Sequence, residues 1–140
     1  MELLSLYAVM AAGLSVLLMP QTAGVPQDDS IDRLLDAIAV VESRDNPGAM
    51  GDHGRAVGVY QIHRSYWAEG TEILGVTWKY ADARDPQKAR QVVRAYLCYY
   101  GRGKTLLEMA RIHNGGPRGH EKPATLTYAR KIEQVLNEQP

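Results

Sequence analysis

The chain has 140 residues, of which 45% are hydrophobic and 23% are charged, with sixteen basic and sixteen acidic side chains. This length corresponds to one domain, with or without an export segment, and the hydrophobic content excludes a disordered tail. The formal net charge of zero argues against a dedicated nucleic-acid binder, so no nucleic-acid partner is expected.

The charges are segregated along the chain. Between Val25 and Ala83 there are five basic and ten acidic residues, whereas residues 84–140 contain eleven basic and five acidic ones. A folded domain could therefore present an acidic region facing a basic one, which suits a cleft for a polar polymer. Charged faces that simply point to solvent are the alternative interpretation.

The first 24 residues have the composition of an export segment. Residues 3–19 form an almost uninterrupted apolar run without charge, and a proline and small residues follow it. This pattern predicts a signal peptide over residues 1–24, cleaved near Ala23 or Gly24, with an uncleaved membrane anchor as the alternative. In both cases residues 25–140 form an exported domain, secreted or retained in the cell envelope (periplasm), and any membrane contact is limited to the N-terminal segment.

Apolar side chains at helical spacing predict the first helix of the domain, which starts at Asp29 or Ser30 and continues through Glu42. Its buried face consists of Ile31, Leu34, Leu35 and Ile38. Residues 44–58 are rich in Gly, Asn, Asp and Pro, so they can hold a small hairpin but not a helix. Residues 59–67 are predicted to form the beginning of a short helix.

Capping residues delimit the helices of the second half. The pair Asp85-Pro86 predicts the N-cap and first residue of a helix that Gly101 ends. Thr105 and Glu108 form a capping box ahead of the next helix, and Pro123 opens the last one. The sequence therefore predicts a mainly α fold of the α+β class, with a helical core and at most a small β-hairpin.

The residues that usually bind metals show no suitable pattern. Cys98 is the single cysteine, which excludes an intramolecular disulfide and a cysteine-based zinc site. Its position in a helical pattern predicts a small, buried core residue. The four histidines lack the i, i+4 spacing of a helical metal site, so no metal ion or other cofactor is expected.

Glu42 is the first candidate for acid–base chemistry. It follows Ile31 by eleven residues, which returns it to the apolar face of the first helix, at the helix C-terminus. Both surroundings disfavour a charged carboxylate, so the proton of Glu42 should be held more tightly than in water, as a general acid requires. The alternative is a Glu42 that points to solvent or pairs with Arg44 or Arg55.

Glycoside hydrolysis needs a second carboxylate, and the turns after the first helix offer Asp45 and Asp52. Asp52 is the better candidate, because the surrounding Gly51-Asp52-His53-Gly54 turn leaves it solvated, hydrogen-bonded and therefore ionised. Asp45 has the position of a turn initiator. The sequence thus predicts a protonated Glu42 opposite an ionised Asp52.

Three stretches of the sequence resemble one known family. They are ESRDNPGAMGDHGRAVGVYQIHRSYW (residues 42–67), DPQKARQVVRAYLCYYG (residues 85–101) and ARIHNGGPRG (residues 110–119). Together they resemble the invertebrate-type lysozymes of the destabilase family. The Glu-Ser pair followed by Gly-Val-Tyr-Gln-Ile is also similar to the wider lysozyme-like group, which includes goose-type lysozymes and SLT (soluble lytic) transglycosylases.

This resemblance implies a lysozyme-like fold and cleavage of the β-1,4 bond between N-acetylmuramic acid and N-acetylglucosamine in peptidoglycan. It implies that Glu42 is the catalytic acid and Asp52 the second carboxylate. The same matching places the following residues along the cleft: Tyr60, Gln61 and Ile62 on one side, and His113, Asn114 and Gly115 on the other. The chain lacks the disulfides of the invertebrate family, which favours a bacterial-type exported relative held together by its core and helix caps.

Three alternative functions are left open by the sequence. A lytic transglycosylase would use Glu42 alone and leave an anhydro product. A peptidoglycan-binding module would have no catalytic activity, and an isopeptidase would cleave amide cross-links instead of glycosidic bonds. The expected partner is peptidoglycan or a related N-acetylated glycan in most of these cases, and the oligomeric state is unknown.

Overall fold

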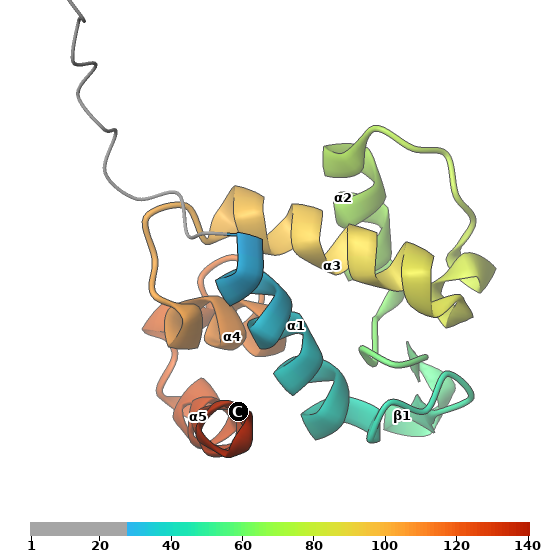
Figure 1. The fold of residues 1–140 in the computed structure, drawn as a ribbon. Helices are drawn as coiled ribbons and strands as arrows, with labels where there is room; N and C mark the ends of the chain where they lie inside the picture. The colour runs from blue at the N-terminus through green and yellow to red at the C-terminus, as the bar shows by residue number, and fades with distance from the viewer. Residues whose placement is uncertain (1–27) are drawn as a thin grey trace, which may run out of the picture.

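The computed structural model describes residues 28–140, so the predicted export segment lies outside the described residues. This part of the chain folds into helices and one small antiparallel hairpin, which confirms the predicted mainly α architecture (Figure 1). The α-helices are α1 (Asp28–Ser43), α2 (Arg64–Leu74), α3 (Pro86–Tyr100), α4 (Leu106–Gly115) and α5 (Leu126–Glu138), and the strands are β1 (Met50–Gly51) and β2 (Ala56–Val57). None of the helices within residues 28–140 is long and apolar enough to cross a membrane.

Helix α1 lies at the centre of the core. Its residues Leu34, Leu35 and Ile38 are fully buried, as their helical spacing predicts. Helix α1 packs against α3, α4 and α5, while α2 packs against α3. The C-terminal end of α1 points towards the hairpin, so Glu42 lies where the helical core meets the hairpin (Figure 1).

Side-chain caps fix the starts of α3 and α4. The Asp85 carboxylate accepts hydrogen bonds from the backbone N–H groups of Gln87 and Lys88, at 2.9 and 3.0 Å. Thr105 and Glu108 form a reciprocal capping box at the start of α4. Both predicted caps are confirmed, because such caps depend on a few neighbouring residues and not on the rest of the fold.

Residues 59–67 were predicted to form the beginning of a short helix, but α2 starts only at Arg64. Before it, Val57 and Ile62 pair in an isolated antiparallel bridge around a tight turn. In this turn Gln61 has a positive φ of 49°, which a right-handed helix cannot accommodate. The predicted helix start was therefore too early by several residues.

Cys98 is exposed, so the prediction of a buried core cysteine is wrong. The core-facing positions of α3 next to it belong to Tyr96 and Leu97. Each further residue of a helix turns the side chain by about 100°, which directs Cys98 away from the core.

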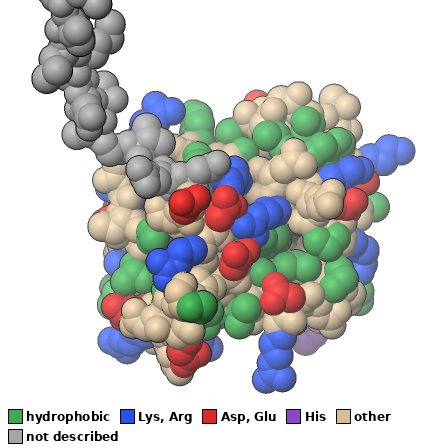
Figure 2. All heavy atoms as spheres, viewed as in Figure 1, with side chains coloured by type: hydrophobic (Ala, Val, Ile, Leu, Met, Phe, Trp, Pro, Cys, Tyr) green, Lys and Arg blue, Asp and Glu red, His purple; other side chains and the backbone are tan. Residues whose placement is uncertain are grey.

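Ion pairs between α1 and α3 join acidic residues of the first half of the domain to basic residues of the second half. The Asp32 carboxylate binds Arg94 and Arg90, and Arg90 also contacts Asp36 at 2.7 Å. Hydrogen bonds from Arg94 and Arg90 hold the pKa of Asp32 below its ordinary value. Figure 2 shows acidic and basic side chains next to each other on this face. Here the acidic and basic regions therefore meet in direct contact and not across a cleft.

Candidate active site

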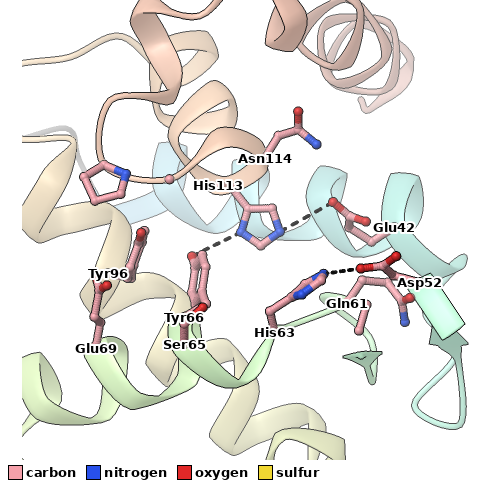
Figure 3. A pocket seen from close by; sticks show the side chains of 13 residues that line it. Glu42, Asp52, Gln61, His63, Ser65, Tyr66, Glu69, Tyr96, His113 and Asn114 are labelled. Carbon is pink, nitrogen blue, oxygen red and sulfur yellow. Dashed lines mark hydrogen bonds and ion pairs between the residues drawn. The ribbon is translucent and has the colours of Figure 1, made fainter. Parts of the chain in front are cut away.

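A cleft of about 580 Å³ is bordered by the C-terminal end of α1, the hairpin, the start of α2 and the end of α4 (Figure 3). Three carboxylates line it, namely Glu42, Asp52 and Glu69, together with two histidines and two tyrosines. Concave sites of this volume, with a few converging polar groups, are typical of ligand-binding sites.

Glu42 lies in the last turn of α1 and faces the cleft (Figure 3). Its side chain is only 19% exposed, and its Oε1 atom lies 3.5 Å from Nε2 of His113 on α4. The His113 side chain is itself 4% exposed. Glu42 is therefore a shielded carboxyl group that contacts an imidazole in the described chain, and not the arginines that the sequence offered as alternatives.

Two tyrosine hydroxyls lie next to the Glu42 and His113 side chains. The Tyr66 hydroxyl lies 3.1 Å from Nδ1 of His113, and burial raises the pKa of Tyr66 well above its ordinary value. The Tyr128 hydroxyl is buried without a partner at hydrogen-bond geometry among residues 28–140. Burial, together with the nearby Glu42, raises the pKa of Tyr128 as well. Both hydroxyls therefore stay protonated and can act as hydrogen-bond donors beside Glu42.

Asp52 has different surroundings. It lies in the 3₁₀ turn Asp52–Gly54 between the two strands, and its side chain is 43% exposed. One carboxylate oxygen binds the Arg55 guanidinium at 2.9 Å, and the other lies 3.5 Å from Nε2 of His63. Asp52 also has a positive φ of 49°, a conformation that non-glycine residues adopt rarely and that often occurs at functional sites. The turn thus holds a solvated, ion-paired carboxylate at the cleft.

Ser43 connects the Glu-Ser pair at the end of α1 to the Gly-Val-Tyr-Gln-Ile stretch. The Ser43 hydroxyl donates a hydrogen bond to the Val59 carbonyl at 2.8 Å and accepts one from the backbone N–H of Asn46 at 3.1 Å. These bonds join the end of α1 to the stretch that follows the hairpin. They therefore fix the position of Glu42 relative to the opposite side of the cleft.

Two glycines allow close approaches at this junction, and at Gly58 the close neighbour is backbone. A Cβ atom at Gly51 would lie 2.3 Å from Oε1 of Gln61, so the glutamine side chain occupies the space that glycine leaves free. At Gly58, which has a φ of +75°, a Cβ atom would lie 2.5 Å from the Ala83 carbonyl oxygen. The Gln61 amide in turn donates to the Gly58 carbonyl at 2.9 Å while its side chain lines the cleft.

The structure brings together five of the residues that the sequence assigned to the cleft. These are Glu42, Asp52, Gln61, His113 and Asn114.

Tyr60, Ile62 and Gly115 do not line the cleft, so these three assignments are corrected. Tyr60 is 2% and Ile62 is 1% exposed, and both belong to the core, because the turn at Gln61 directs only the glutamine outwards. Gly115 packs towards Thr125, and the rim of the cleft is formed by the next two residues instead.

Sequence reasoning missed several residues of the cleft, one directly before α2 and the others on α2 and α3. They are His63, Ser65, Tyr66, Glu69 and Tyr96. Ser65 and Glu69 are four residues apart, so a helix starting at Arg64 presents them on one face beside Tyr66.

No group of three or more His, Cys, Asp or Glu residues within residues 28–140 is arranged to hold a metal ion. The side chains that line the cleft offer carboxyl, imidazole, hydroxyl and amide groups.

Comparisons with known proteins agree with this arrangement. The family model described as Transglycosylase SLT domain matches residues 18–136. Lysozymes of the oysters Ostrea edulis and Magallana gigas are 41% and 42% identical over 83 and 81 residues, or 56% and 55% of this chain. These matches cover 59% and 58% of the two relatives, so the chain spans less than two thirds of their length.

A lysozyme of Meretrix lusoria matches over a larger share, with 33% identity across 74% of this chain and 88% of the relative. The crystal structure of Aeromonas hydrophila PliI in complex with Meretrix lusoria lysozyme contains a chain that superposes with a TM-score of 0.63 and 32% identity. That match covers 74% of this chain and 88% of the other. The fold and the cleft therefore define a lysozyme-like domain.

The chain belongs to the family of Transglycosylase SLT domains. Within this group, the resemblance to invertebrate-type lysozymes that the sequence motifs indicated is confirmed by the lysozyme relatives.

Proposed function

We propose that this protein is a peptidoglycan hydrolase, a lysozyme of the muramidase type that cleaves the β-1,4 bond between N-acetylmuramic acid and N-acetylglucosamine. The observation that carries this proposal is the pair of carboxyl groups in one cleft, with Glu42 19% exposed and Asp52 43% exposed and bound to Arg55. Two carboxyl groups with contrasting surroundings are what general acid catalysis at a glycosidic bond requires.

In the proposed mechanism, Glu42 donates a proton to the glycosidic oxygen while the C–O bond breaks. Asp52 stabilises or traps the oxocarbenium-like centre that develops on the sugar. Water then completes the reaction, with Glu42 acting as the base. Gln61 and Asn114 are neutral amides at the cleft, suited to hydrogen bonds with N-acetyl groups.

A lytic transglycosylase is the second candidate, and the family description favours it. In that reaction the 6-hydroxyl of N-acetylmuramic acid takes the place of water, and Glu42 performs all acid–base steps. The two reactions leave different products: hydrolysis gives a reducing muramic acid end, whereas transglycosylation gives a 1,6-anhydro end.

The test is digestion of purified peptidoglycan, followed by mass spectrometry of the products. The proposal expects reducing ends, and anhydro ends would replace it by the transglycosylase. Binding to peptidoglycan without any new glycan ends would indicate a non-catalytic module. Release of amine from a γ-glutamyl-lysine peptide would indicate an isopeptidase.

We further propose that the protein acts outside the cytoplasm, in the cell envelope or as a secreted protein. Residues 1–24 have the composition of an export segment, and peptidoglycan lies on that side of the membrane. Appearance of the protein in the periplasmic or culture fraction, dependent on residues 1–24, is the corresponding test.

A further inference from the structure

A second groove continues the cleft at its hairpin end. It consists of two adjoining hollows of about 360 and 480 Å³, which share Gly54, Arg64 and Tyr80 as lining residues. The smaller hollow also includes His63 and Ser65, which line the catalytic cleft as well. We call this surface the basic groove; it runs from the cleft over the start of α2 to the 3₁₀ segment η2 (Tyr80–Arg84).

The basic groove has a strong excess of positive charge. It is lined by four cations, Arg55, Arg64, Lys79 and Arg84, and by no acidic residue. Only Arg55 has an ion-pair partner, Asp52, among residues 28–140. The Lys79 ammonium has Asp82 in its neighbourhood, but that carboxylate forms its ion pair with Lys88. Arg64 and Arg84 therefore give the groove two guanidinium groups without an ion-pair partner among residues 28–140, which favours an anionic ligand.

Contacts within the groove hold these cations in place. The Arg64 guanidinium lies 4.6 Å from the centre of the Tyr80 ring, a cation–π contact. The Tyr80 hydroxyl is anchored by the carbonyl oxygens of Ile62 and Arg55, at 2.8 and 2.9 Å. The Arg84 guanidinium contacts the sulfur atom of Met50 at 3.2 Å. Two of the groove's arginines thus have a defined position before any ligand binds.

The opposite end of the cleft has the opposite charge. Glu69 lines the cleft and also a neighbouring hollow that contains Glu72 and the tyrosines Tyr99 and Tyr100. An anionic group attached to a bound polymer would therefore be repelled at the α2–α3 end and attracted at the hairpin end.

We propose that the basic groove binds the carboxylates of the stem peptide that peptidoglycan carries. This inference rests on the proposed function. The stem peptide branches from the lactyl group of N-acetylmuramic acid and ends in free carboxylates, so a sugar bound in the cleft brings anionic groups to its edge. The groove begins at His63 and Ser65 in the cleft itself, and its guanidinium groups can bind carboxylates through two parallel hydrogen bonds.

The test compares two substrates with the full chain. One is peptidoglycan freed of wall phosphodiester polymers, and the other is the same glycan after an amidase has removed the stem peptides. The groove variant combines Arg64→Gln, Lys79→Gln and Arg84→Gln. The control combines Arg102→Gln, Arg130→Gln and Lys131→Gln, which removes the same charge from exposed positions outside the groove.

We expect the groove variant to lose about tenfold or more in kcat/KM on peptide-bearing glycan, mainly through KM, and to retain its activity on stripped glycan. The control should act on both substrates like the wild type, and added salt should weaken the preference of the wild type for peptide-bearing glycan. Thermal unfolding of each variant establishes that it is folded.

Equal losses on both substrates, or no loss on either, would overturn the proposal. A groove effect that requires walls still carrying phosphodiester polymers would also overturn it, in favour of phosphate as the anion. Failure of the proposed function is a separate result, because the wild type would then cleave neither substrate or would release anhydro ends in place of reducing ends.

Discussion

The cleft has two walls that hold the same chemical group in different surroundings. The buried wall consists of Glu42, Tyr66 and His113 on three helices, and the exposed wall consists of Asp52, Arg55 and His63 on the hairpin turn and before α2. The Glu42 side chain is 19% exposed and the Asp52 side chain is 43% exposed. Each carboxylate has a histidine 3.5 Å away, but only the exposed one also has a guanidinium partner.

The difference between the walls shows how one fold assigns two roles to two carboxyl groups. A helix end packed against rings excludes water, which favours proton transfer by the group placed there. A turn leaves its carboxylate solvated and paired with a cation, which favours the stabilisation of positive charge on a substrate. In this interpretation the walls are not interchangeable. Three experiments examine that point, and a fourth concerns the ion pairs between α1 and α3.

Glu42→Gln should have the largest effect. It keeps the size of the side chain but removes the proton donor, so we expect kcat on peptidoglycan to fall by about 10³-fold. The matched control is Glu133→Gln, an exposed position on α5 that should behave like the wild type. Activity within tenfold of the wild type for Glu42→Gln would mean that the buried wall does not supply the acid.

Asp52→Asn should have a smaller effect, because the exposed wall stabilises charge but does not transfer the proton. We expect a fall in kcat of about 10- to 100-fold, measured as release of reducing ends. Asp45→Asn, the other acid of these turns, is the control and should change little. Unchanged muropeptide release by Asp52→Asn, together with anhydro ends, would assign all chemistry to the buried wall and replace the hydrolase by a transglycosylase.

The two histidines give a direct comparison of the walls. His113→Gln disturbs the contacts of the imidazole with Glu42 and Tyr66, so kcat should fall about tenfold with little change in KM. His63→Gln alters only an exposed contact with Asp52 and should cost less than about threefold. Kinetics across a pH range, with thermal unfolding to monitor the fold, provides the measurement. A larger loss for His63→Gln would reverse the assignment of the walls.

The smallest effect concerns stability at a site away from both walls. The pKa of Asp32 lies below its ordinary value because Arg94 and Arg90 bind the carboxylate. The stabilisation is therefore complete above about pH 4 and is lost as the pH falls through the lower pKa of the folded state. Asp32→Asn should reduce the free energy of unfolding by less than about 1 kcal/mol at pH 7, since the side chain is partly exposed.

Denaturant unfolding at pH 7 and at about pH 2 measures this effect, and the wild type and Asp32→Asn should converge in acid. A variant that is equally destabilised at both pH values would mean that packing, and not the ion pairs with α3, accounts for the loss.

Much of the fold was predictable because it depends on short-range patterns. The spacing of Leu34, Leu35 and Ile38 identified the buried face of α1, and the same periodicity directed Glu42 towards the interior. The caps at Asp85 and Thr105 were predictable from a few neighbouring residues. The start of α2 was not, since it depends on the backbone conformation of a turn that pairs residues on both of its sides.

The sequence by itself determined the helices, their buried faces and the two carboxyl groups offered for chemistry, because periodicity and capping act within a few residues. Only the tertiary structure decided which side chains surround those groups. His113 meets Glu42 through the packing of α4 against α1 and also contacts Tyr66 on α2, and Tyr60 enters the core because the turn before α2 reverses direction. Contacts between residues tens of positions apart depend on how helices pack, and no local pattern encodes that geometry.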